Sequence, residues 1–158
     1  TTQIDHIIVS PFGIFIIETK NHKGMIFGDC FGKVWTQVLR GAGKFTFYSP
    51  VRQNEIHIKH LSRAIKIPAN CMIGLIVFTN ENVNLDNVNC PFCYRVQGLY
   101  DVILSYNQPI FTEKQVSKII DRIDKVNISG YKNTQKHVAF VKGLKEQAEM
   151  RKRLQRGF

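Results

Sequence analysis

The sequence predicts a mixed α/β sandwich, with helices covering both faces of a central sheet. Two β-branched runs, residues 6–9 and 14–17, flank a Ser-Pro-Phe-Gly turn and indicate a β-hairpin. The run 71–78 is apolar without alternation, which is typical of a strand covered on both faces. Helical patterns lie before this run, at 50–67, and after it, from residue 113. Strands with helices on either side of a buried strand predict the sandwich.

Between the hairpin and the first helix, short β-type runs separated by glycines predict a meander with strands at 24–27, 34–37 and 45–48. Ser49 is a suitable N-cap and Pro50 suits the first helical position, so a helix begins here and ends before Pro68. After the buried strand, we expect a short strand at 94–96 and a short helix at 99–106. Thr112 and Gln115 then form a capping box for the next helix.

The length of 158 residues allows one compact domain. We expect a core domain over 1–128 and a basic helical extension over 129–158. Because the net charge is +10, a polyanionic partner is expected, either nucleic acid or an anionic membrane surface. Few large apolar residues lie in the basic extension, which disfavours the membrane. No apolar run reaches the length of a membrane span.

The start of the chain has neither a basic n-region nor an apolar h-region, so no signal peptide is visible and a cytoplasmic location is expected. The chain begins without Met and enters a strand almost at once. We therefore expect a fragment of a longer protein that carries further domains.

Four cysteines are present: Cys30, Cys71, Cys90 and Cys93. Without a secretion signal, free and buried thiols in a reducing compartment are the simplest expectation. The Cys90-Pro-Phe-Cys93 spacing is also that of half a zinc knuckle. A structural zinc site needs four ligands, and only scattered residues are left to complete one: Cys71, His57 and His60.

The first hairpin determines where three charged residues lie. With Pro11 and Phe12 at its tip, Asp5 falls opposite Glu18 on one face of the sheet, with Cβ atoms about 4.5–5.5 Å apart. Lys20 shares that face, about 7 Å along the strand. Two carboxylates in this arrangement repel unless a cation lies between them, either Lys20 or a divalent ion. Mg²⁺ takes one or two protein carboxylates, and the carbonyl of Thr19 offers a further oxygen. The alternative is that both acids are solvated strand ends.

These residues resemble the nuclease-related domain (NERD) family, a branch of the PD-(D/E)xK restriction-endonuclease-like superfamily. The resemblance covers about Gln3 to Tyr106 and rests on Asp, Gly and Glu-x-Lys at the family's spacing. The matching segments are Gln3–Val9, Gly13–Asn21, Gly24–Ile26, Trp35, Ser49–Asn54 and the strand ending at Phe78. The resemblance implies a restriction-endonuclease-like core, a mixed sheet flanked by helices.

The resemblance also implies a Mg²⁺-dependent deoxyribonuclease, with Mn²⁺ as a substitute ion. Asp5 and Glu18 would be metal ligands, Lys20 the catalytic lysine and Gln53 the residue that positions lysine or phosphate. His57, one helical turn after Gln53, would contact DNA, or else be a plain surface histidine. Basic residues near the predicted site are candidate phosphate contacts: Lys23, Lys33, Arg40, Lys44 and Arg52.

One departure from the family concerns the start of the chain. Family members usually carry an N-terminal helix with a Gly-Glu motif and a first strand, and both would precede Thr1. We therefore expect the core to lack these two elements and a fragment of this extent to be inactive. The alternative function is a catalytically inactive nuclease-like module that binds nucleic acid or a protein partner.

Overall fold

The computed structural model describes residues 3–126. Its strands are β1 (His6–Ser10), β2 (Gly13–Lys20), β3 (Gly24–Asp29), β4 (Val34–Leu39), β5 (Gly43–Tyr48), β6 (Met72–Phe78), β7 (Val83–Asn89) and β8 (Cys93–Arg95). Its helices are α1 (Pro50–Ile65), α2 (Val96–Ser105) and α3 (Glu113–Val126), with a 3-10 turn at Ala69–Cys71. The predicted basic extension over 129–158 lies outside the described residues.

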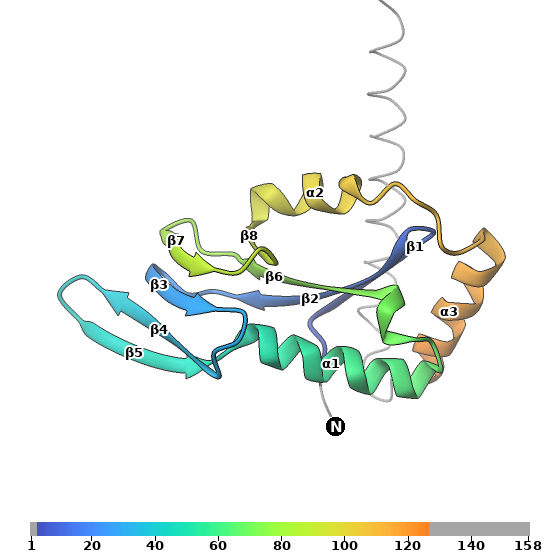
Figure 1. Ribbon diagram of the computed structural model, residues 1–158, viewed down its shortest axis with the longest axis horizontal. Helices are drawn as coiled ribbons and strands as arrows, with labels where there is room; N and C mark the ends of the chain where they lie inside the picture. Colours follow the sequence, from blue (N-terminus) through green and yellow to red (C-terminus); the bar gives the residue numbers. More distant parts are fainter. Residues whose placement is uncertain (1–2, 127–158) are drawn as a thin grey trace, which may run out of the picture.

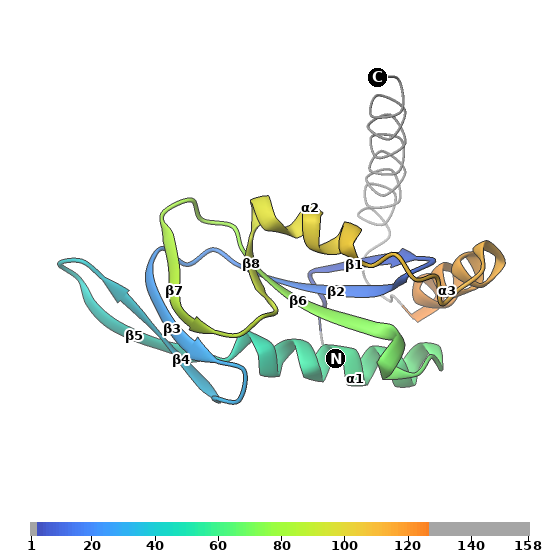
Figure 2. The same ribbon diagram turned by 45° about the horizontal axis from the view of Figure 1, so that its top comes forward.

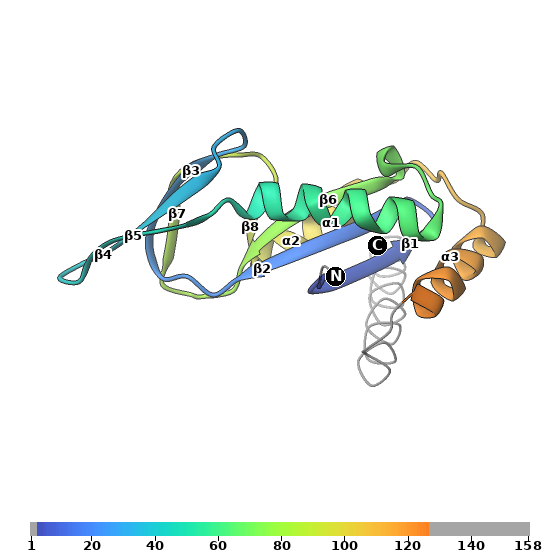
Figure 3. The same cartoon turned by 90° about the horizontal axis from the view of Figure 1, so that it is seen from below.

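The central sheet has the strand order β1-β2-β6-β8. Helix α1 crosses one face of this sheet, α2 covers the other, and α3 lies at the end near β1 (Figure 1, Figure 3). Strand β2 is parallel to β6 and antiparallel to β1, so the sheet is mixed. The predicted sandwich is confirmed, and its arrangement is consistent with a restriction-endonuclease-like core.

The first hairpin has the predicted register, with Ser10 opposite Gly13 and His6 opposite Ile17. Gly13 has φ +151°, and a Cβ added there would lie 2.4 Å from Ile73 Cδ1. This φ is one that residues with a side chain rarely adopt, and an added Cβ would also displace the Ile73 side chain, so the position favours glycine. The hairpin register is therefore fixed at its tip.

Strand β2 divides the apolar core between the two faces of the central sheet. On one face Ile14 and Ile16 pack with Leu61 and Ile65 of α1. On the other, Phe15 and Ile17 pack in a cluster with residues of α2. All four β2 side chains are buried, because the strand is covered on both faces.

Helix α1 begins as predicted, and one polar residue joins it to the sheet in addition to its apolar contacts. Ser49 Oγ accepts a hydrogen bond from Arg52 N at the N-terminus. The helix ends at Ile65, where Lys66 adopts a left-handed conformation with φ 55°. Asn54 Nδ2 donates to Ile16 O at 2.8 Å and to Leu75 O at 3.2 Å, so this buried amide joins the helix to β2 and β6.

The predicted meander forms a second sheet with the order β5-β4-β3-β7 (Figure 2). Strand β7, which the sequence pattern does not predict, pairs in parallel with β3. The fully buried Trp35 stacks on Phe78 at the end of β6, with ring centroids 6.4 Å apart. This packing joins the second sheet to the central one.

Cys30 and Cys90 form a disulfide with a Cα–Cα distance of 5.1 Å. The prediction of four free thiols is therefore wrong for this pair, while Cys71 and Cys93 are free. The two loops that carry Cys30 and Cys90, after β3 and after β7, are brought together by β3–β7 pairing. A disulfide sulfur is not a thiolate ligand, so the structure gives no support to a zinc site at Cys90.

No helix within residues 3–126 is long and apolar enough to cross a membrane.

Candidate active site

Glu18 and Lys20 lie at the carboxyl end of β2, on the face that α1 covers. They continue the stripe begun by Ile14 and Ile16, as the two-residue period of a strand requires. Glu18 is paired with Ile76 of β6 in the ladder and is only 2% exposed. The end of an apolar stripe thus holds a buried carboxylate and an ammonium group.

The ammonium group of Lys20 joins the strand to the helix. Its Nζ donates to Glu18 Oε1 at 2.6 Å and to Gln53 Oε1 at 2.9 Å. The first of these is a charge-assisted hydrogen bond between partly buried groups, which is stronger than a neutral one. The structure therefore brings together three of the predicted site residues.

His57 lies in the interior, although the sequence predicts a surface histidine or a DNA contact. It is 5% exposed, and its Nε2 lies 3.3 Å from Glu18 Oε2. The cause is its position on α1: four residues after Gln53, it occupies the same helix face, which packs on the sheet. The expectation of a surface side chain is corrected, and His57 becomes a neighbour of the buried carboxylate.

Asp5 lies one residue before β1 and is exposed. The ladder ends at the pair His6–Ile17, one pair before the expected pairing of Asp5 with Glu18. Asp5 Oδ2 instead accepts hydrogen bonds from Thr19 N at 2.9 Å and from Thr19 Oγ1 at 2.7 Å. Asp5 is therefore held at the carboxyl end of β2, with Thr19 rather than Glu18 as its partner.

The oxygen atoms at the end of β2 suit a hard cation. Within residues 3–126 no three His, Cys, Asp or Glu side chains converge as a metal cluster. Mg²⁺, however, usually takes only one or two protein carboxylates and keeps several waters. Glu18 Oε2 is buried and accepts no hydrogen bond from the described residues. A buried oxygen of this kind is a suitable ligand atom, so the residues present fit the implied ion.

The predicted phosphate contacts fall into two groups. Lys23, Lys33, Arg40 and Lys44 are exposed, in the loops around the second sheet or on β5. Arg52 is instead engaged within the protein: Nη1 bonds Glu55 Oε2 at 3.1 Å and Nη2 donates to Phe31 O at 3.1 Å. Its guanidinium group therefore links the start of α1 to the loop after β3.

Asn54 is not identified from the sequence as a structural residue, although its position in the helical pattern indicates that it is buried. Val51, Leu61 and Ile65 define the buried face of α1, and helical spacing places Asn54 on that same face. A polar side chain at such a position needs hydrogen-bond partners. The partners are backbone carbonyls of two strands, which no local pattern identifies.

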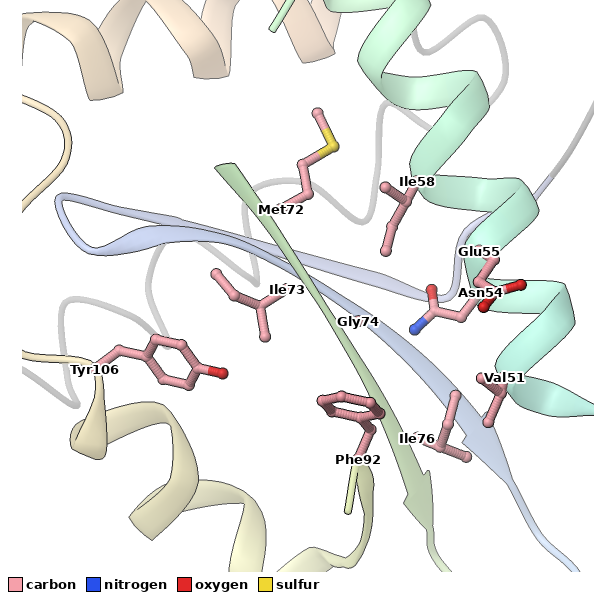
Figure 4. Close-up of a pocket in the computed structure, with 10 residues that line it drawn as sticks. All are labelled: Val51, Asn54, Glu55, Ile58, Met72, Ile73, Gly74, Ile76, Phe92 and Tyr106. Atoms are coloured by element: carbon pink, nitrogen blue, oxygen red, sulfur yellow. The ribbon is translucent and has the colours of Figure 1, made fainter. Parts of the chain in front are cut away.

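A groove of about 340 Å³ lies elsewhere on the central sheet, between α1 and the end of α2 (Figure 4). It follows the part of β6 that precedes the pairing with β8, which begins at Ile76. Its lining is mainly apolar, with Ile58, Met72 and Phe92 among the contributors. None of the residues around Lys20 lines it, so the candidate active site is separate from this groove.

A Glu-x-Lys strand packed under a helix that supplies glutamine, within a mixed sheet flanked by helices, is the arrangement expected of restriction-endonuclease-like proteins. The family model described as nuclease-related domain (NERD) matches residues 1–79, half of the chain. The chain belongs to this family, which is consistent with the PD-(D/E)xK superfamily. The matched region contains all the residues gathered around Glu18.

Among curated proteins, an uncharacterized protein of Bacillus anthracis is 32% identical over 145 residues. The similarity covers 89% of this chain and 67% of the relative. No solved structure matches the chain significantly.

Proposed function

We propose that this chain is a metal-dependent nuclease domain that hydrolyses phosphodiester bonds of DNA. The observation that carries the proposal is the position of Lys20 Nζ, held between Glu18 Oε1 and Gln53 Oε1. Membership of the nuclease-related domain family supports it. The net charge of +10 suits a phosphate backbone.

In this proposal Lys20 steadies the negative charge that develops on the phosphate. An ammonium group has three donors, and Glu18 and Gln53 use two of them. The third can donate to a substrate oxygen while the other two hold the group in place, which avoids reorganisation during the reaction. Glu18 and Gln53 would thus orient the lysine.

Asp5, Glu18 and the carbonyl of Thr19 would hold Mg²⁺ or Mn²⁺. When bound, the ion would supply Lewis-acid stabilisation of the phosphodiester and a water of lowered pKa. Thr19 N faces the edge of β2 where Asp5 lies, and the N–H and C=O of a strand residue point to the same edge. Asp5 and the Thr19 carbonyl are therefore on one side of the strand.

The second candidate function is a nuclease-like module that binds DNA without cutting it. It is favoured by the separate engagement of the two carboxylates, Asp5 with Thr19 and Glu18 with Lys20 and His57. In such a module the contacts of Lys20 would serve stability alone.

The test is incubation of the protein, expressed from its complete reading frame, with supercoiled plasmid in Mg²⁺, Mn²⁺ or EDTA. We expect nicking in either metal and none in EDTA. Glu18→Gln and Lys20→Ala should abolish nicking, because they remove the carboxylate charge and the ammonium group. Asp101→Asn and Lys118→Ala are matched controls, since both residues are exposed on other helices.

Nicking that persists in Glu18→Gln would contradict the proposed role of this site. Plasmid binding without nicking in either metal would instead favour the non-cutting module. Circular dichroism of each variant establishes that a loss of nicking is not a loss of fold.

A further inference from the structure

The second sheet ends in a projecting hairpin, formed by β4, β5 and the turn at residues 40–42. It extends away from the helices and the central sheet in all three views (Figure 1, Figure 2, Figure 3). Among the strands of residues 3–126, β5 lies at the edge of its sheet and pairs with β4 alone. We call this hairpin the arm.

The arm presents large aromatic side chains to solvent. Phe45 is 49% exposed and Tyr48 is 51% exposed, both on the edge strand β5. Phe47 is half-buried and stacks on the ring of His22, with centroids 4.2 Å apart and planes at 22°. Exposed aromatic residues that gather on an edge strand are typical of an interaction surface.

Phe45 and Phe47 lie on the same face of the arm, because side chains two apart on a strand share a face. The register supports this: Gln37 of β4 is opposite Phe45, and Trp35 is opposite Phe47. Gln37 Oε1 is in turn 3.2 Å from His22 Nδ1. One face of the arm therefore carries a row of flat side chains: Phe45, then Phe47 with His22.

The charge of the arm is of one sign. From Cys30 to Asn54 the chain contains no Asp or Glu, whereas it contains Lys33, Arg40, Lys44 and Arg52. Arg40 and Lys44 are exposed on the arm itself. Grouped basic residues attract polyanions. The positive surface of the arm is therefore complementary to a phosphate backbone.

The arm is continuous with the candidate active site. His22 follows Lys20 by two residues, and β5 leads through Ser49 into α1, which carries Gln53. The base of the arm is held by Ser49 N donating to Lys33 O at 2.9 Å, and by the disulfide of Cys30. Because the base of the arm is held in this way, the position of the aromatic row relative to Lys20 is fixed.

We propose that the arm binds single-stranded DNA, with unpaired bases stacking on Phe45 and on the His22–Phe47 pair. Arg40, in the turn of the arm, contacts a phosphate, and Lys44, whose side chain leaves β5 on the face opposite Phe45, reaches another around the edge of the sheet; the strand runs along the arm toward Lys20. Every base has a flat face that an aromatic ring can stack on, but in a duplex those faces are covered by neighbouring base pairs. The inference rests on the proposed function, because it takes DNA as the polymer and extends the site to unpaired substrate.

The test is fluorescence anisotropy with labelled oligo(dT) of about 20 nucleotides and with a duplex of equal length, in EDTA so that no strand is cut. We expect the protein to prefer the single strand. Phe45→Ala should weaken oligo(dT) binding by at least about fivefold, and Phe45→Trp should retain it. Phe92→Ala is the matched control, because Phe92 is 47% exposed but lies in the loop between β7 and β8.

The proposed phosphate contacts are tested separately, by the salt dependence of the affinity for oligo(dT). Lys44→Ala should reduce the slope of log affinity against log salt by about 0.7, the value for one phosphate on a single strand. An unchanged slope, no binding of oligo(dT), equal effects of Phe45→Ala and Phe92→Ala, or tighter duplex binding would each overturn the proposal.

The experiments can disprove the arm proposal and the proposed nuclease function independently of each other. If the protein nicks plasmid while Phe45→Ala binds oligo(dT) normally, the arm proposal is wrong and the proposed function stands. If binding in EDTA depends on Phe45 but plasmid is not cut in either metal, the proposed function is wrong and the arm stands.

Discussion

His57 Nε2 lies 3.3 Å from Glu18 Oε2, while the other oxygen of the same carboxylate accepts a hydrogen bond from Lys20. Glu18 is therefore bracketed by one nitrogen from helix α1 and one from its own strand. Burying a carboxylate costs free energy unless polar partners replace water. Lys20 supplies the hydrogen bond to the buried carboxylate, and His57 is a polar neighbour of its second oxygen, which accepts no hydrogen bond from the described residues.

Replacing His57 should therefore destabilise the fold. We expect His57→Leu to lower the free energy of unfolding by about 1–3 kcal/mol, because an apolar side chain would replace the polar group next to the buried carboxylate. Urea unfolding measures the change. His60→Leu, at an exposed position on the same helix, should stay within about 0.5 kcal/mol of the parent protein. Equal stability of the two variants would contradict the importance of the contact.

Gln53 should matter for activity more than for stability. Gln53→Ala removes one of the two acceptors that orient Lys20, so we expect plasmid nicking to slow by about 10- to 100-fold. Because Gln53 is only half-buried, the free energy of unfolding should change by less than about 1 kcal/mol. Gln97→Ala, exposed on α2, is the control. A variant that nicks at the parent rate would show that the lysine needs no such support.

The disulfide should make a large contribution to stability. Cys30 and Cys90 are 60 residues apart, and closing a loop of that length restricts the unfolded chain by about 4 kcal/mol in the chain-entropy model. We expect the double variant Cys30→Ser, Cys90→Ser to lose about this much in urea unfolding. Dithiothreitol should produce a similar loss in the parent protein and none in the variant. Cys71→Ser, at a free cysteine, serves as the control.

Cys93 should be unreactive while the protein is folded. Burial raises the pKa of its thiol from an ordinary value of 9.0 to about 12. At pH 8 we expect iodoacetamide to modify Cys93 at least about a hundredfold more slowly in the folded protein than in guanidinium chloride, because the thiolate is the reactive form. Peptide mass spectrometry distinguishes Cys93 from Cys71. Similar rates in the two states would place the thiol in contact with water.

The same pKa determines the direction of a pH effect on stability. Above pH 9 ionisation of the Cys93 thiol lowers the free energy of the unfolded chain, while the folded protein keeps the neutral thiol until about pH 12. The contribution of the buried neutral thiol to the free energy of unfolding is therefore complete below pH 9. It is lost as the pH rises from 9 toward 12.

Features set by neighbouring residues could be predicted from the sequence. The hairpin register follows from the position of Pro11 and Phe12 in the turn, and this register carried Glu18 and Lys20 to the correct face. Ser49 and Pro50 are local signals, and they identified the first residue of α1 correctly. In both cases the physical cause lies within a few residues along the chain.

Features that depend on distant pairing could not be predicted. Strand β7 contains Asn and Asp residues that are rare in strands, and it exists because β3 pairs with it. That pairing also brings Cys30 to Cys90, and disulfide connectivity does not follow from spacing. The burial of His57 likewise depends on which face of α1 meets the sheet.

The two hydrogen bonds of Asn54 to β2 and β6 set the rotation of α1 about its own axis. Gln53 and His57 are on this helix, and Leu61 and Ile65 anchor its other half in the core. A helix turned by one residue would swing by about 100° and carry both polar side chains away from Glu18. The position of Gln53 and His57 beside Glu18 therefore depends on the same packing of α1 on the sheet that completes the core.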